Sequence, residues 1–235
     1  MGRQEDKTED PRRRLLLKAL AAATFSLGIS TQGWSEVFGK VPRPLPAGRS
    51  IYEVTGLLTV NSTVADQSTL IRAGDLLETG PDGHVIFVVG KDAFILREKS
   101  QLRLMGDGFV VETLRLATGA LLSVFGKGQH HIQTPVATAG IRGTGVYVEA
   151  SPELTYLCTC YGTTEIIVVD RPHETETVTA THHEPRYIAA HGDRRIRKAP
   201  FKSHTDFELM LIEALVDRVP PFALFDDGYG AVRRY

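Results

Sequence analysis

The stretch TPVATAGIRGTGVYV, residues 134–148, decides how the chain is expected to fold. It begins with apolar strand residues, carries three glycines within six positions, and then resumes an alternating apolar pattern. Glycine permits left-handed backbone angles and close approach of neighbouring strands, so this spacing predicts a tight turn between two strands. The predicted turn residues are Gly140, Arg142, Gly143, Thr144 and Gly145. The guanidinium of Arg142 is expected to bind turn carbonyls, and a ligand-contacting loop is the alternative.

Together with two earlier segments, this stretch resembles the FecR-type periplasmic domain of bacterial envelope proteins. The earlier segments are GLLTVN at 56–61 and AGDLLETGPDGH at 73–84, and the match covers residues 51–170, about half of the chain. The resemblance implies an antiparallel β-sandwich or β-roll. The family's archetype joins this domain to a cytoplasmic segment that binds a sigma factor, but only ten residues precede Pro11 here. Direct regulation of a sigma factor is therefore not expected.

Composition narrows the classes of function. The 235 residues are 42% hydrophobic, and 27 Lys and Arg nearly balance 28 Asp and Glu, so one ordinary core and no nucleic-acid partner are expected. The sequence lacks a Gly-x-Ser-x-Gly elbow, a phosphate-binding glycine loop and a His-Glu-x-x-His motif. These absences predict that the protein is not an enzyme.

The N-terminus has the pattern of an export signal. PRRRLLLK at 11–18 is followed by uncharged residues 19–33, which is typical of a twin-arginine signal spanning residues 1–35. No Ala-x-Ala cleavage site follows, so an uncleaved signal that tethers the protein to the membrane is an alternative to release. A proline-rich linker, residues 36–50, then leads to the β domain. The predicted location is the periplasm.

Residues 51–192 alternate short apolar runs with turn-forming clusters, which predicts an antiparallel sandwich or β-roll. A C-terminal extension, residues 193–235, contains an amphipathic helix predicted at 203–218. Ser203 is its predicted N-cap and Asp206 its capping-box partner, while Asp206, Glu213 and Asp217 form a polar ridge. The apolar side is expected to pack on the β domain, or alternatively to contact an envelope protein partner.

Cys158 and Cys160 are the only cysteines, and they lie in the predicted strand TYLCTCY at 155–161. Residues two apart on a strand point to the same face, so both sulfurs project together. Three interpretations compete. A disulfide would have to buckle the strand, because the Cα atoms would lie about 6.5 to 7 Å apart. The cysteines could instead pack as small apolar residues, or they could supply thiolates to a metal.

Histidines about 20 residues later supply further ligands. If 165–170 and 175–181 pair as a hairpin, His182 and His183 return to the end of the cysteine strand. Adjacent strand residues face opposite sides, so at most one of the two is expected to bind a metal. His191 or His204 is a further candidate. The predicted metal ligands are therefore drawn from Cys158, Cys160, His182, His183 and His191.

This mixture of sulfur and nitrogen ligands suits zinc, copper or iron. Similar FecR-type sequences usually carry plain valine and leucine on the cysteine strand and a small glycine-containing turn at the histidines. The favoured function is therefore an exported binding module that holds a metal or a metal cofactor. The alternative is a metal-free interaction or regulatory module of an envelope signalling assembly, in which the cysteines form a disulfide or pack in the core.

Overall fold

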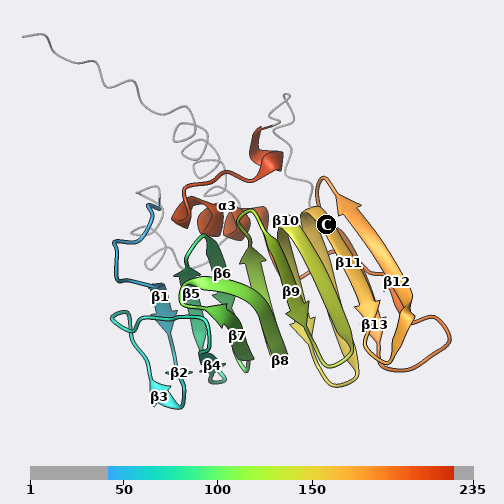
Figure 1. Ribbon diagram of the computed structural model, residues 1–235, viewed down its shortest axis with the longest axis horizontal. Helices are drawn as coiled ribbons and strands as arrows, with labels where there is room; N and C mark the ends of the chain where they lie inside the picture. The colour runs from blue at the N-terminus through green and yellow to red at the C-terminus, as the bar shows by residue number, and fades with distance from the viewer. Residues whose placement is uncertain (1–41, 225–235) are drawn as a thin grey trace, which may run out of the picture.

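The computed structural model describes residues 42–224 (Figure 1). The predicted export signal lies outside these residues, and 42–50 of the predicted linker contain neither helix nor strand. Fourteen strands, the α-helix α3 and the 3-10 helix η1 make up the described part. The elements are β1 (Ile51–Thr55), β2 (Leu58–Val60), β3 (Thr63–Val64), β4 (Leu76–Thr79), β5 (His84–Val89), β6 (Asp92–Leu96), β7 (Gln101–Asp107), β8 (Val110–Val124), β9 (Gln129–Gln133), β10 (Ala137–Ala150), β11 (Leu154–Val168), β12 (Arg171–Ala180), β13 (Glu184–Ala189), β14 (Ile196–Lys198), α3 (Asp206–Leu215) and η1 (Pro221–Leu224).

All fourteen strands belong to one sheet. Three long strands, β8, β10 and β11, each pair with different neighbours along their length, and the sheet therefore folds back on itself. The first part of β8 pairs with β7 and β9, and its last part pairs with β6 and β10. In the same way, β11 pairs with β13 near its start and with β12 near its end. A closed five-stranded barrel with additional strands results. The expected mainly β class is confirmed, and β14 carries the sheet beyond residue 192, where the β domain was predicted to end.

Strands in the middle of the sheet bury both faces. In β6, Phe94 and Leu96 belong to the main core, whereas Ala93 and Ile95 point the other way into a second apolar cluster. This alternation follows from the two-residue period of a strand. Helix α3 covers the second cluster with Leu209, Ile212 and Leu215, and Figure 1 shows it lying across β6 and β8. The predicted packing of the helix on the β domain is confirmed.

The glycine-rich stretch does not form the predicted turn. Strand β10 runs through it without a break, and the pairing register with β11 shifts on either side of Gly145. Gly143 adopts a left-handed φ of 57°, and a Cβ on Gly145 would lie 2.5 Å from the Tyr161 ring. The glycines therefore allow a bulge in the strand and leave room for the buried Tyr161 ring. A tight turn requires glycine for the same two reasons, backbone freedom and close approach. Arg142 is exposed opposite Thr163 in this strand rather than inside a turn.

The helix begins later and ends earlier than predicted. Its N-cap is Thr205, whose hydroxyl accepts from the backbone N–H of Glu208, and the Glu208 carboxylate accepts from the backbone of Thr205. Ser203 lies before the helix with a left-handed φ of 66°. Glu213, predicted on a polar ridge, is 4% exposed because its face of the helix turns toward the sheet.

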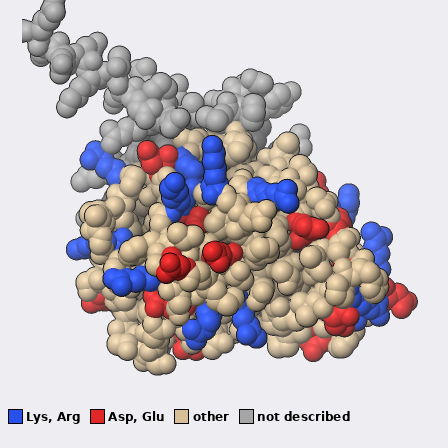
Figure 2. All heavy atoms as spheres, in the orientation of Figure 1, with Lys and Arg blue, Asp and Glu red and all other residues tan. Residues whose placement is uncertain are grey.

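The visible surface carries both signs of charge. Figure 2 shows Lys and Arg side chains interspersed with Asp and Glu over the face that it presents. Among residues 42–224, no helix has the length and apolar character needed to span a membrane.

Candidate metal centre

Strand β11 delivers both cysteines to the second apolar cluster. Cys158 and Cys160 have no exposed surface, and both are free thiols. Because they are two residues apart on a regular strand, both sulfurs lie on the face that α3 covers. The predicted common face of the two side chains is confirmed, and the sulfurs are not joined in a disulfide.

His183 reaches the cysteines from the bend between β12 and β13. Its backbone N–H donates to the carbonyl of Cys160 at 3.0 Å, and its φ is 50°. Left-handed angles are uncommon outside glycine, and such strain clusters at functional sites. The His183 ring is 10% exposed, whereas that of His182 is 47% exposed. The bend therefore points one imidazole of the pair into the interior.

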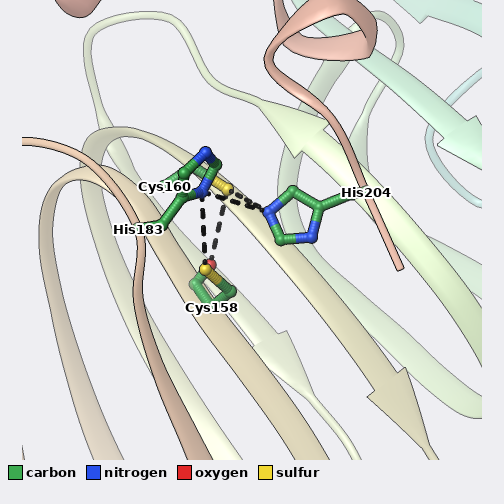
Figure 3. A group of neighbouring side chains, drawn as sticks. All are labelled: Cys158, Cys160, His183 and His204. Carbon is green, nitrogen blue, oxygen red and sulfur yellow. Dashed lines mark hydrogen bonds between the residues drawn. The ribbon is translucent and has the colours of Figure 1, made fainter. Parts of the chain in front are cut away.

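His204 approaches from the opposite side, just before α3. Its side chain is 3% exposed and stacks on Tyr147 with ring centroids 4.5 Å apart. Its Nδ1 lies 2.9 Å from the carbonyl oxygen of Lys202, which can only accept, so Nδ1 carries the proton. In the neutral ring, the lone pair is then on Nε2, which faces the cysteines (Figure 3).

The four ligand atoms converge as the corners of a tetrahedron would. Cys160 Sγ is 3.3 Å from His204 Nε2, Cys158 Sγ is 3.7 Å from His183 Nδ1, and the two nitrogens are 3.3 Å apart. All four atoms lie within 4.8 Å of one another. With zinc bonds of about 2.3 Å to sulfur and about 2.0 to 2.1 Å to nitrogen, a tetrahedron has nitrogen–nitrogen edges of about 3.3 to 3.4 Å and sulfur–nitrogen edges of about 3.5 Å. The residues present therefore fit one tetrahedral ion.

Asp206 orients His183 from behind. Its Oδ1 is 2.8 Å from His183 Nε2, so Nε2–H donates to the carboxylate, and in the neutral ring Nδ1 directs its lone pair toward the cysteines. His182 Nε2 lies 2.8 Å from the same oxygen. These separations are hydrogen-bond lengths. His182, His183 and Asp206 form a second group of converging donor atoms, but in the four-residue arrangement His182 and Asp206 lie behind His183.

The pKa shifts favour the charged forms of Cys158 and His183. Hydrogen bonds from Cys160, His183 and His204 outweigh burial and lower the pKa of Cys158, while burial raises the pKa of Cys160. Burial opposes a charged His183, yet the hydrogen bonds to Asp206 and Cys158 raise its pKa to about 9. A cation that binds here would replace protons on these groups, so its affinity depends on pH.

Cys158, His183 and Asp206 also stand in the order of a nucleophile, a base and an orienting acid. Nucleophilic catalysis requires the sulfur to meet a substrate. Cys158 is fully buried, so the described structure offers a substrate no access to it.

The structure brings together part of the predicted ligand set. Cys158, Cys160 and His183 meet at the site, and His204 completes it as one of the two further candidates. His191 is 84% exposed and lies 3.5 Å from Glu153, away from the cluster. His182 and His183 lie in a bend rather than on a strand, and both reach Asp206, so the strand-face argument does not apply. Only His183 of the pair joins the two cysteines, and the prediction that at most one of the two binds a metal stays a prediction. The supporting role of Asp206 was missed, although its position two residues after His204 was a usable signal.

Comparisons with known proteins leave the family open. No family model and no curated protein matches the chain. Two crystal structures described as those of a candidate anti-sigma factor from Parabacteroides distasonis ATCC 8503 are similar in part. One is 11% identical over 53% of this chain and 58% of its own, with a TM-score of 0.45. The other is 14% identical over 61% and 60%, with a TM-score of 0.33. The chain thus spans about three fifths of the structures it matches, and likeness at this level supports no functional assignment.

Proposed function

We propose that this protein is an exported envelope module, with a FecR-like sandwich or β-roll, that binds one metal ion through Cys158, Cys160, His183 and His204. One observation carries the proposal: the four ligand atoms converge at tetrahedral separations. Hydrogen bonds hold both imidazoles in the tautomer that binding needs. Export to the periplasm rests on the signal-like sequence at 11–18, and an uncleaved signal would leave the module tethered to the membrane.

Zinc fits this ligand set best. Four protein ligands, three of them buried and His183 nearly so, leave no position for a substrate, as in structural zinc sites. Two thiolates also neutralise a dication, which lowers the cost of burying it. Copper and iron remain the other candidates because thiolate and imidazole ligands suit them as well. A two-iron cluster with cysteines on one iron and histidines on the other fits poorly, because here each sulfur lies beside a nitrogen.

The test is metal analysis of the full chain, purified without chelator. We expect about one metal ion per chain in the native protein, and background levels when both cysteines are replaced by serine. The matched control is His191→Gln, which changes an exposed histidine outside the cluster and should leave the metal content unchanged. A native protein without metal above background would overturn the proposal.

A thiol count separates the remaining alternatives. After denaturation with chelator and without reductant, both cysteines should react with a thiol reagent. Fewer than two reactive thiols would indicate a disulfide. A metal-free protein with two free thiols and an intact fold would instead support the interaction or regulatory module, with an envelope partner.

A further inference from the structure

We infer that the metal site is a clasp that holds α3 on the sheet, so that metal occupancy controls whether this helix stays docked. The inference rests on the proposed metal binding and adds a consequence of it. The ligands come from three separate parts of the chain: β11 supplies both sulfurs, the bend at 182–183 supplies one imidazole, and the segment before α3 supplies the other. A bound ion therefore joins the helix segment to the sheet.

The helix segment contributes two groups within three residues. His204 is a ligand, Thr205 is the N-cap, and Asp206 is the first helical residue and the acceptor for His183. Release of His204 would also move Asp206, because both belong to the same short turn of backbone. Metal binding and the start of α3 are thus mechanically linked.

Helix α3 depends on contacts with the rest of the protein because it is short. It has 10 residues, and isolated helices below about 12 to 15 residues are marginal in water. Its other attachments include the apolar contacts of Leu209, Ile212 and Leu215 and an ion pair from Arg97 to Glu208 at 2.7 Å. Toward its end, Glu213 accepts a hydrogen bond from Tyr161 of β11. Arg97 also donates to the carbonyl of Ser203 at 2.9 Å.

Without an ion, the ligand groups hold His204 weakly. Their direct contact with His204 from β11 is a sulfur–imidazole approach, and sulfur is a weak hydrogen-bond partner. A single hydrogen on His183 Nδ1 cannot serve both Cys158 Sγ and His204 Nε2 well, so one of these buried groups lacks a good partner. Buried polar groups without good partners cost free energy, so the metal-free state favours separation of His204 from the cysteines.

Undocking of α3 would uncover an apolar strip of the sheet. Five side chains from β5, β6 and β8 lie under the helix, and each is at most 4% exposed. They are Ile86, Ala93, Ile95, Leu122 and Val124. A contiguous apolar patch of this kind binds hydrophobic probes, which gives the clasp a measurable output.

The test compares hydrogen exchange and binding of a hydrophobic dye in the full chain with metal bound, after chelation, and after zinc is restored. Chelation should speed exchange of the α3 amides about ten-fold and increase dye binding, while amides of β10 change less than about two-fold. Restored zinc should reverse both effects. His204→Ala should keep the fast exchange even with zinc added, whereas His191→Gln should behave as the native protein.

Two results would overturn the clasp. Equal α3 exchange in samples shown to differ in metal content would mean that the helix does not depend on the ion. Equally faster exchange in β10 would mean that the metal supports the whole fold rather than this segment. Metal content is measured in every sample, so failure of metal binding itself appears separately, as a native protein without metal.

Discussion

Two glycines of β10 should respond very differently to the same substitution. A Cβ on Gly145 would lie 2.5 and 2.8 Å from two carbon atoms of the Tyr161 ring, whereas ordinary contacts of a Cβ begin near 3.4 Å. A Cβ on Gly140 would meet nothing closer than 3.9 Å. Neither residue has a left-handed backbone, so alanine tests space alone.

The cost at Gly145 follows from what holds the Tyr161 ring. Its hydroxyl donates to Glu213, which is 4% exposed and also accepts from Arg218 Nε at 2.5 Å. The ring can give way only by weakening its bond to a buried carboxylate. Overpacking costs about 1 to 3 kcal/mol and a hydrogen bond to a charged group about 1.5 to 3 kcal/mol, and the two overlap in part. We therefore expect Gly145→Ala to lower the free energy of unfolding by about 2 to 4 kcal/mol.

The assay is denaturant unfolding of the full chain for Gly145→Ala, Gly140→Ala and Tyr161→Leu, with Gly145→Ala also placed in the Tyr161→Leu background. Gly140→Ala should change stability by less than about 0.5 kcal/mol. In the leucine background, the cost of Gly145→Ala should shrink because the ring is gone. Equal costs for the two glycine substitutions, or an undiminished cost without the ring, would refute the reasoning.

Three further predictions concern the metal centre and a nearby ion pair. Zinc at a concentration about a thousand-fold above its Kd should stabilise the native chain by about 4 kcal/mol, which raises Tm by about 8 to 16 °C in a thermal melt. The double cysteine-to-serine variant should show no shift in Tm. Asp206→Asn should weaken zinc binding about 10 to 100-fold in a competition titration, because His183 loses its charged acceptor. Burial opposes ionisation of Glu149, but its hydrogen bonds from Lys202 at 2.6 Å, from Ser203 and from Tyr147 together outweigh burial and lower its pKa. Its stabilising contribution is therefore present above its ordinary value of 4.5 and is lost as the pH falls through its folded pKa, so Glu149→Gln should flatten the acid limb of a stability–pH curve.

The sequence predicted those parts of the site that depend on local periodicity. The common face of Cys158 and Cys160 follows from the two-residue period of a strand, and the β11–β12 hairpin follows from two strand-like runs around a short turn. The hairpin brings the histidine bend back to the cysteines. Selection of His183 over His182 depends on a left-handed angle in that bend, which no period encodes.

His204 and Asp206 were harder to predict because their place depends on tertiary packing. Two candidate capping boxes overlap there, Ser203 with Asp206 and Thr205 with Glu208, and the second matches the usual Glu or Gln more closely. The second forms, and Arg97, which follows β6, binds both Glu208 and the carbonyl of Ser203. That contact spans more than 100 residues of sequence.

The position of the Cys/His cluster in the core would suit a structural rather than a catalytic use of the proposed metal. The second apolar cluster contains aliphatic and tyrosine side chains together with the two cysteines. Near the start of α3, the two thiols lie beside two imidazoles. Such groups pack poorly against one another unless something satisfies them together. A single cation, bound as proposed, would satisfy all four groups together at the start of α3. The chemistry that makes this buried cluster costly without an ion would then join the helix to the sheet.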